Sequence, residues 1–184
     1  MNSSAVIKKF YSVLPVVRNW IDDLLEGHID QATPVIKLEY QRLRQVFPSD
    51  LLEKAKVVIV AGKVPFPPLA RMGLFELEEM EHIPMAGITY KDTFFVNQVH
   101  RTKSLHFHEL VHVVQWERLC VDNFLLAYGV GLMQFGYHNS PLEQIAYSLQ
   151  KDFDRGSLPS GIVEAIGQKT DAIWSHVASL VSQV

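Results

Sequence analysis

The sequence SLHFHELVHVVQWERL, residues Ser104–Leu119, predicts the helix around which the rest of the chain must pack. Apolar residues lie on nearly every side of this segment, so we expect the helix to be central and buried. His108 and His112 are four positions apart, a spacing that places both side chains on one helical face, one turn apart. Buried polar groups need partners, and one divalent metal ion would partner both rings. The segment therefore predicts a metal site.

Glu109 completes the pattern H-E-x-x-H and indicates a specific chemistry. Two imidazoles can hold Zn²⁺ at about 2.0–2.1 Å each, and the ion lowers the pKa of its water toward about 7. Because Glu109 lies beside the metal-binding face, it could take that proton as a general base and pass it to a leaving amine. The alternative is structural: His108 and His112 would be hydrogen-bonded core or cleft residues, and Glu109 would only pair with a base.

The composition is that of a globular protein. The chain has 184 residues, of which 48% are hydrophobic and 20% charged, and this length suits one domain with a closed core. A net charge of −3 without a basic stripe sets a nucleic-acid partner aside. Cys120 is the single cysteine, which excludes an internal disulfide and a thiolate zinc cage. Any zinc must therefore be held by histidine and carboxylate groups.

Periodicity and breaker residues predict helical regions on either side of a short stretch of strands. The β-branched run at 56–60 predicts a strand, and 87–96 predicts a hairpin around Lys91-Asp92. Helices are expected over residues 3–27, 34–46, 49–54, 104–118, 121–136, 141–154 and 160–182.

These elements predict an α+β fold, mostly helical, with a small central sheet and the buried H-E-x-x-H helix. We expect a single domain over 1–184, with N-terminal helices at 1–50, a metal-site core at 56–147 and a C-terminal helix at 160–184.

Two apolar stretches could be read as a membrane span or as a signal peptide. Asn123–Leu142 contains no Asp, Glu, Lys or Arg, but polar residues and a proline interrupt or end it, which favours a buried helix followed by a turn. The run Phe10–Val17 carries Pro15 and meets no small-residue cleavage site, which favours a packed amphipathic helix over a signal peptide. We therefore expect no membrane span and a cytoplasmic location.

The run HELVHVVQ, which begins at His108, resembles the active-site helix of the zincin metallopeptidases, particularly of small bacterial and phage domains. The resemblance covers roughly Val57–Tyr147 and implies a zincin-like fold around zinc, acting on peptide or protein substrates. The longer metzincin pattern would need Gly and His where this chain has Gln115 and Arg118, so the resemblance is to the glutamate type.

In glutamate-type zincins the third ligand lies on a later helix, and the resemblance implies Glu143 for this role. The segment HNSPLEQIAY is similar to an N-P-x-E-x-x-A-Y segment, from which it departs by Ser140, and Glu143 follows His112 by 31 positions. A structural alternative is a capping box, in which Glu143 bonds back to the amide of Ser140. The rival ligands are His138, His106 and Asp122, of which His106 points well around the helix.

Other residues are candidates for support of the site. Tyr147 lies one turn after Glu143 and could donate a hydrogen bond to a developing oxyanion, with Tyr137 and His138 as rivals. Gln115 could support a metal ligand, since it follows the motif directly. The hairpin at 87–96 either presents an edge strand to an extended peptide or is a simple core sheet.

The sequence thus leads to a first hypothesis of a zinc-dependent hydrolase, a metallopeptidase in which Glu109 and Tyr147 act on the substrate while His108, His112 and Glu143 hold the metal. The second hypothesis is a non-catalytic metal-binding interaction module of a larger assembly, which a closed coordination sphere would favour. The third is a metallohydrolase that acts on a non-peptide amide.

Overall fold

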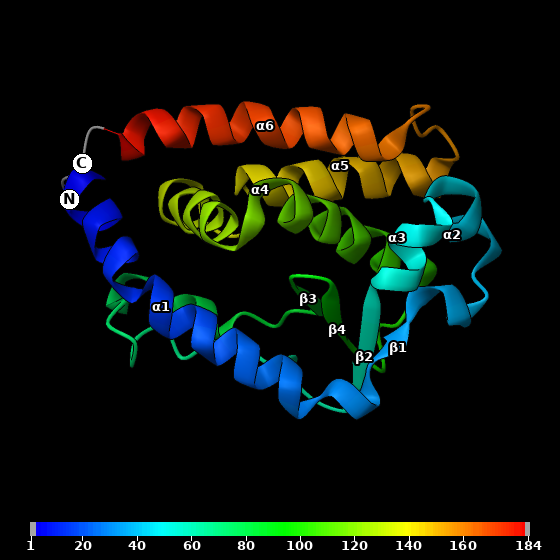
Figure 1. The fold of residues 1–184 in the computed structure, drawn as a ribbon, viewed down its shortest axis with the longest axis horizontal. Helices are drawn as coiled ribbons and strands as arrows, with labels where there is room; N and C mark the ends of the chain where they lie inside the picture. The colour runs from blue at the N-terminus through cyan, green and yellow to red at the C-terminus, as the bar shows by residue number, and fades with distance from the viewer. Residues whose placement is uncertain (1–2, 183–184) are drawn as a thin grey trace.

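The computed structural model describes residues 3–182, in which helical regions flank a short stretch of strands (Figure 1). The α-helices are α1 (Ser3–Gly27), α2 (Gln41–Val46), α3 (Ser49–Lys54), α4 (Lys103–Phe135), α5 (Pro141–Arg155) and α6 (Ile162–Val181). The strands are β1 (Thr33–Pro34), β2 (Lys56–Val60), β3 (Gly87–Tyr90) and β4 (Thr93–Asn97), and the 3₁₀ helices are η1 (Ile29–Gln31), η2 (Val35–Leu38) and η3 (Phe75–His82). The α+β, mostly helical fold predicted from the sequence is therefore confirmed.

The sheet has the order β1-β2-β4-β3 and is mixed. The central strands β2 and β4 are parallel, with Val57 opposite Phe94, and both outer strands pair antiparallel to their neighbours. Because side chains alternate across a strand, Val57 and Phe94 belong to one apolar cluster while Val58 and Phe95 belong to another. The sheet is thus covered on both faces, and β3 is an outer strand.

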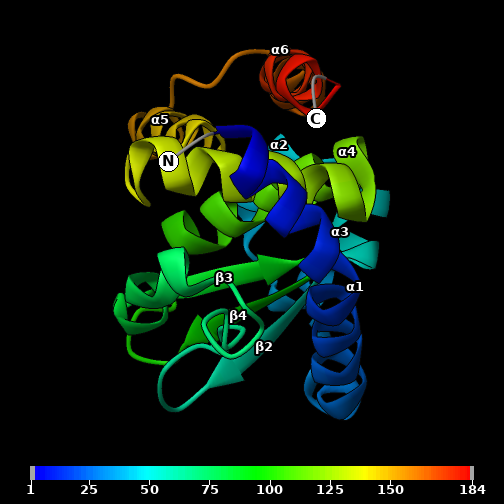
Figure 2. The ribbon, with the colours of Figure 1, turned by 90° about the vertical axis from the view of Figure 1, so that its left-hand side faces the viewer.

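Helix α4 lies in the middle of the molecule, with the sheet on one side and α5 and α6 on the other (Figure 2). Phe107, Leu110 and Val111 in its first half are fully buried among side chains of the sheet, α5 and α6. Each such side chain contributes about 1.5–3 kcal/mol by leaving water. The central, buried helix predicted from its apolar circumference is present, and it begins where the Thr102 hydroxyl accepts a hydrogen bond from the Leu105 amide.

A kink at Cys120 divides α4 into two helical halves. Cys120 has φ 60° and ψ 173°, a conformation that costs a residue with a side chain about 1–3 kcal/mol. The predicted break between residues 118 and 121 is therefore confirmed, although the two halves follow each other without a loop. The second half turns back toward α1 and packs Phe124 and Val130 into the same apolar cluster as that helix.

Helix α1 packs beside the sheet and the second half of α4 (Figure 2). Its apolar side chains recur at helical spacing and fill the cluster that includes Val58 and Phe95, as Phe10, Val17 and Ile21 show. Trp20 meets Tyr90 of β3 edge to face, with the ring centroids 5.6 Å apart. Helix α1 thereby forms a wall next to β3.

One predicted helix is wrong. Residues 34–46 do not form a single helix, because Thr33 and Pro34 pair with β2 and the chain then passes through η2 before α2 begins at Gln41. Glu39 separates the two pieces with a left-handed backbone, φ 56°. The pairing of β1 with β2 is a long-range contact that outweighed local helical periodicity. The strand at 56–60, the hairpin and the remaining helices lie within a few residues of the expected bounds.

Among the helices of residues 3–182, the structure contains none with the length and apolar character required to cross a membrane. The uncharged stretch from Asn123 forms the buried second half of α4, in which Leu126 and Ala127 are 1% exposed, and a turn follows it.

Candidate metal centre

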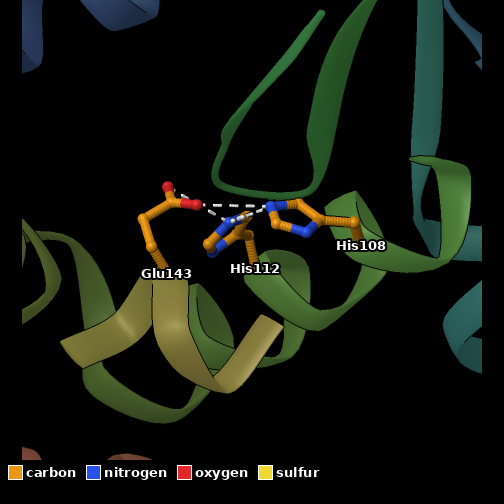
Figure 3. Close-up of side chains that lie close together, drawn as sticks. All are labelled: His108, His112 and Glu143. Carbon is orange, nitrogen blue, oxygen red and sulfur yellow. Dashed lines mark hydrogen bonds and ion pairs between the residues drawn. The ribbon is translucent and has the colours of Figure 1, made fainter. Parts of the chain in front are cut away.

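His108, His112 and Glu143 form a buried group that could hold a metal ion (Figure 3). The two histidines project from one face of α4, and Glu143 projects toward them from the first turn of α5. The Nε2 atoms of the histidines are 3.1 Å apart, and Glu143 carboxylate oxygens lie 3.3 Å from His108 Nε2 and 3.4 Å from His112 Nε2. All three residues are at most 5% exposed.

This arrangement fits a tetrahedral ion. Ligand atoms about 2.0–2.1 Å from one ion at tetrahedral angles are about 3.3 Å from each other, close to the three distances between these residues. Glu143 Oε2 is buried and has no hydrogen-bond partner, a costly state for a carboxylate oxygen that a cation would relieve. Two imidazoles and a carboxylate are also a ligand set that zinc favours, with a fourth position left for water.

Gln115 fixes the orientation of His112. Its amide nitrogen donates to the Leu142 carbonyl at 3.1 Å, which turns its carbonyl oxygen toward His112 Nδ1 at 2.8 Å. His112 Nδ1 must therefore carry a hydrogen, and Nε2 is the atom directed at the cluster. Gln115 is fully buried, and the supporting role predicted for it fits these contacts.

A longer chain of hydrogen bonds orients His108. His108 Nδ1 lies 3.1 Å from Gln150 Oε1, and the Gln150 amide donates to Ser104 Oγ at 2.9 Å. Ser104 in turn donates to Asp154 Oδ2 at 2.8 Å. Since Asp154 can only accept when ionised, every donor direction in the chain is set, and His108 also presents Nε2 to the cluster.

Glu143 is held from the second half of α4. The Tyr128 hydroxyl donates to Glu143 Oε1 at 2.7 Å. The capping-box alternative is excluded, because the Ser140 amide donates to the Tyr137 carbonyl and the Ser140 side chain makes no capping bond. Glu143 therefore points into the cluster instead of back along its own helix.

Without a metal ion, opposite charges on His112 and Glu143 stabilise the cluster. Burial alone would lower the pKa of His112, but the Glu143 carboxylate next to it raises that pKa to about 9. Burial likewise opposes ionisation of Glu143, but the charge of His112 and the close approach of both histidine rings lower the pKa of Glu143 well below its usual range. A proton thus lies where a cation would lie, and binding of the cation would release it.

Glu109 lies beside the cluster and is 2% exposed. The Thr89 hydroxyl of β3 donates to its Oε2 at 2.7 Å, and Gly87 passes so close that a Cβ there would collide with the carboxylate. Burial raises the pKa of Glu109, a shift that the two neighbouring histidines only partly offset. A carboxylate with a raised pKa is better matched to proton transfer near neutral pH.

The rival ligands lie elsewhere. His106 is buried, but its Nδ1 bonds to the Thr102 carbonyl and its ring packs against Tyr40. Asp122 pairs with Arg18 at 3.1 Å, and His138 is exposed. Of the four carboxylates and histidines weighed for the third position, the structure brings Glu143 alone to His108 and His112 within the described residues.

The ring of Tyr147 lies 4.7 Å from that of His108, measured between centroids. A cavity adjoins the cluster, and Tyr137 lines it, whereas Tyr147 is not among its lining residues. Its predicted contact with an oxyanion remains a prediction.

Sequence reasoning missed Tyr128, Thr89 and Gln150. The one signal for Gln150 is its place seven residues after Glu143, on the same face of α5.

Comparison of this chain with known proteins identifies no family, since no family model, no curated protein and no solved structure matches it.

Proposed function

We propose that this chain is a zinc-dependent hydrolase, a metallopeptidase that cleaves peptide bonds with water activated at the metal. The single observation that carries the proposal is that Glu109 and the three potential ligands line one cavity. A carboxylate that only stabilised the fold would not be expected to line the same cavity as three potential metal ligands.

Each residue of the site has a proposed role in hydrolysis. A bound Zn²⁺ would supply a Lewis acid that polarises the scissile carbonyl and acidifies water. Glu109 would take a proton from the attacking water and carry it to the leaving amine, while the Thr89 hydroxyl holds its Oε2 atom in place. Tyr147 and Tyr137 are the proposed donors to the oxyanion.

Two features support a peptide substrate and an open site. The outer strand β3 lines the same cavity and pairs with no strand but β4 among the described residues, which supports an extended peptide as the substrate. Three protein ligands leave a fourth position, as in catalytic zinc sites, whereas a purely structural module is typically closed by four. The resemblance of HELVHVVQ to zincin helices points to the same substrate class.

The test is Glu109→Gln, with Glu117→Gln as its matched control on the exposed side of the same helix. We expect Glu109→Gln to keep one zinc per chain by metal analysis and to lose peptide hydrolysis at least about 100-fold, the usual contribution of a general base. Glu117→Gln should keep both, because it disturbs only a surface ion pair with Lys54.

Hydrolysis by Glu109→Gln at the parent rate would remove Glu109 from the reaction. A parent protein that holds zinc yet hydrolyses none of a mixed peptide library would instead support the non-catalytic module.

A further inference from the structure

Trp116 is buried on α4, two turns beyond Glu109 and on the same face of the helix. Its indole Nε1 donates a hydrogen bond to the Thr89 carbonyl of β3 at 3.1 Å. The Thr89 hydroxyl has one hydrogen to donate, and it lies 2.7 Å from Glu109 Oε2 but 3.2 Å from the Glu109 carbonyl. A continuous path of hydrogen bonds therefore leads from Trp116 through Thr89 to the Glu109 carboxylate.

The Thr89 carbonyl points to the outer side of β3. The Ala86 carbonyl accepts a hydrogen bond from the Asn97 amide, and hydrogen-bonded pairs alternate with non-hydrogen-bonded pairs along antiparallel strands. Thr89 and the opposite residue, Phe94, are therefore a non-hydrogen-bonded pair, in which the Thr89 carbonyl faces away from β4. The indole of Trp116 thus supplies the partner that a further strand would otherwise supply.

Strand β3 determines where the Glu109 carboxylate lies. Thr89 holds Oε2, and the Gly87 backbone lies so close to Oε1 that a Cβ there would collide with it. A shift of β3 relative to α4 would therefore move the carboxylate. Among the described residues, the hydrogen bonds between α4 and β3 are those made by Trp116 and Thr89. Only that of Trp116 holds the strand without involving Glu109 itself.

Aromatic stacking fixes the direction of the indole N–H. The ring of Trp116 stacks on Phe124, with centroids 4.0 Å apart and planes 18° apart. Phe124 lies beyond the kink at Cys120 and stacks in turn on Tyr128, the residue that donates to Glu143. Because stacked rings in a packed core cannot turn freely, the indole N–H stays directed at Thr89.

We propose that Trp116 is a positioning residue for Glu109, which it holds in place through Thr89. The proposal rests on the proposed peptidase function for the step that Glu109 performs. A misplacement of about 1 Å in a reacting group can lower a rate about 100-fold, so the hold on β3 should be measurable in catalysis.

The first experiment removes the indole N–H from full-length, zinc-loaded protein. Replacement of Trp116 by 3-benzothienylalanine puts sulfur in place of the N–H and keeps the size of the ring. We expect kcat for a peptide to fall about five- to tenfold with KM within about twofold of the parent's, because the base acts in the transition state. The same replacement of Trp174, on α6, is the matched control and should leave both constants unchanged. Thermal unfolding checks the fold, and a parent-like kcat after the replacement of Trp116 would overturn the proposal.

Variants of Thr89 test whether Trp116 acts through this residue. Thr89→Val suits a strand but lacks the hydroxyl, so kcat should fall about 10- to 100-fold. Thr89→Ser keeps the hydroxyl and should exceed Thr89→Val at least about fivefold in kcat, whereas a merely structural role would favour valine. With Thr89→Val present, the replacement of Trp116 should lower kcat by less than about twofold, because the path is already broken. Fully additive losses would contradict an action through Thr89.

Hydrogen exchange measures the hold on β3 independently of activity. The Ile88 and Tyr90 amides pair with β4, and in metal-free protein they should exchange about two- to tenfold faster after the replacement of Trp116, as expected for the loss of one neutral hydrogen bond. Faster exchange, together with a zinc-loaded parent that hydrolyses no peptide, would refute the peptidase and keep the contact that holds β3. Unchanged exchange, or hydrolysis with additive losses, would refute the positioning role and leave the peptidase in place.

Discussion

The two helices that form the metal centre contribute to it in different ways. Helix α4 supplies His108 and His112, whose relative position follows from one turn of helix. Helix α5 supplies Glu143, which reaches them only because α5 packs along α4 over a long interface. One side of the centre is thus set by local geometry, and the other side by tertiary structure.

The supports of the two histidines differ in the same way. His112 is oriented by Gln115, three residues later on its own helix, and this contact is buried. His108 is oriented from α5 by Gln150, through a chain that ends at exposed Asp154. Helix α5 therefore does more than add a ligand, since it also orients the ring of a histidine on α4.

The strongest test of the α4 side is His112→Ala. Zinc binding free energies of about 10–16 kcal/mol, divided among four ligands, give about 2.5–4 kcal/mol for each ligand, so we expect zinc affinity to fall about 100- to 1,000-fold. Competition with a chelator of known affinity measures it. His176→Ala, at an exposed position on α6, is the control and should leave the affinity unchanged. An affinity equal to the parent's in His112→Ala would show that zinc binds elsewhere.

The next test compares Gln150, which orients His108, with Gln115, which orients His112. Gln150→Leu should lower zinc affinity about 10- to 100-fold with little loss of stability, since Gln150 is only partly buried. Gln115→Leu should lower affinity similarly and also destabilise the metal-free protein by about 1–3 kcal/mol, because it removes two hydrogen bonds in the core, those to His112 Nδ1 and to the Leu142 carbonyl. Chelator competition and urea unfolding of both variants check this. Equal stability of the two variants would contradict the distinction between a buried and an outer support.

The pH dependence tests the link between the helices. Because Glu143 raises the pKa of His112 to about 9, zinc must displace a proton below that pH, and its affinity should rise about tenfold per pH unit from 6.5 to 9. A raised histidine pKa stabilises the metal-free fold fully below pH 6.5, and this stability is lost as the pH rises through 9. In Glu143→Gln the rise in affinity should end well below pH 9, because burial then lowers the pKa of His112 without the opposing carboxylate. A parent protein with pH-independent affinity over this range would argue against the ion pair.

The features that the sequence could predict are those set by local geometry, and the features that it could not predict depend on packing between elements. The helix at Ser104–Leu119 and the facing of His108 and His112 were predictable, because both depend on local periodicity. Glu143 was reached through a similar segment in a known family, and the capping alternative could be excluded only when the packing of α5 was known. The helix expected at 34–46 was wrong because a pairing with β2 competes with it.

The missed residues share one property. Tyr128 reaches Glu143 only because the kink at Cys120 redirects the second half of α4, and Thr89 reaches Glu109 only because β3 lies against that helix. Neither contact leaves a trace in spacing along the chain. Residues that support a site across elements are thus the part that local patterns cannot give.

The smallest expected effect belongs to the outer end of the support for His108. Ser104→Ala removes the hydroxyl between Gln150 and Asp154 but leaves the Gln150 carbonyl free to meet His108. We expect zinc affinity to fall only about two- to fivefold, since the lost neutral hydrogen bond lies in a partly exposed place and is worth about 0.5–1.5 kcal/mol. The same chelator competition measures it, with Ser148→Ala on the exposed face of α5 as control. A loss as large as that of Gln150→Leu would mean that the surface carboxylate, acting through Ser104, is what orients the ring.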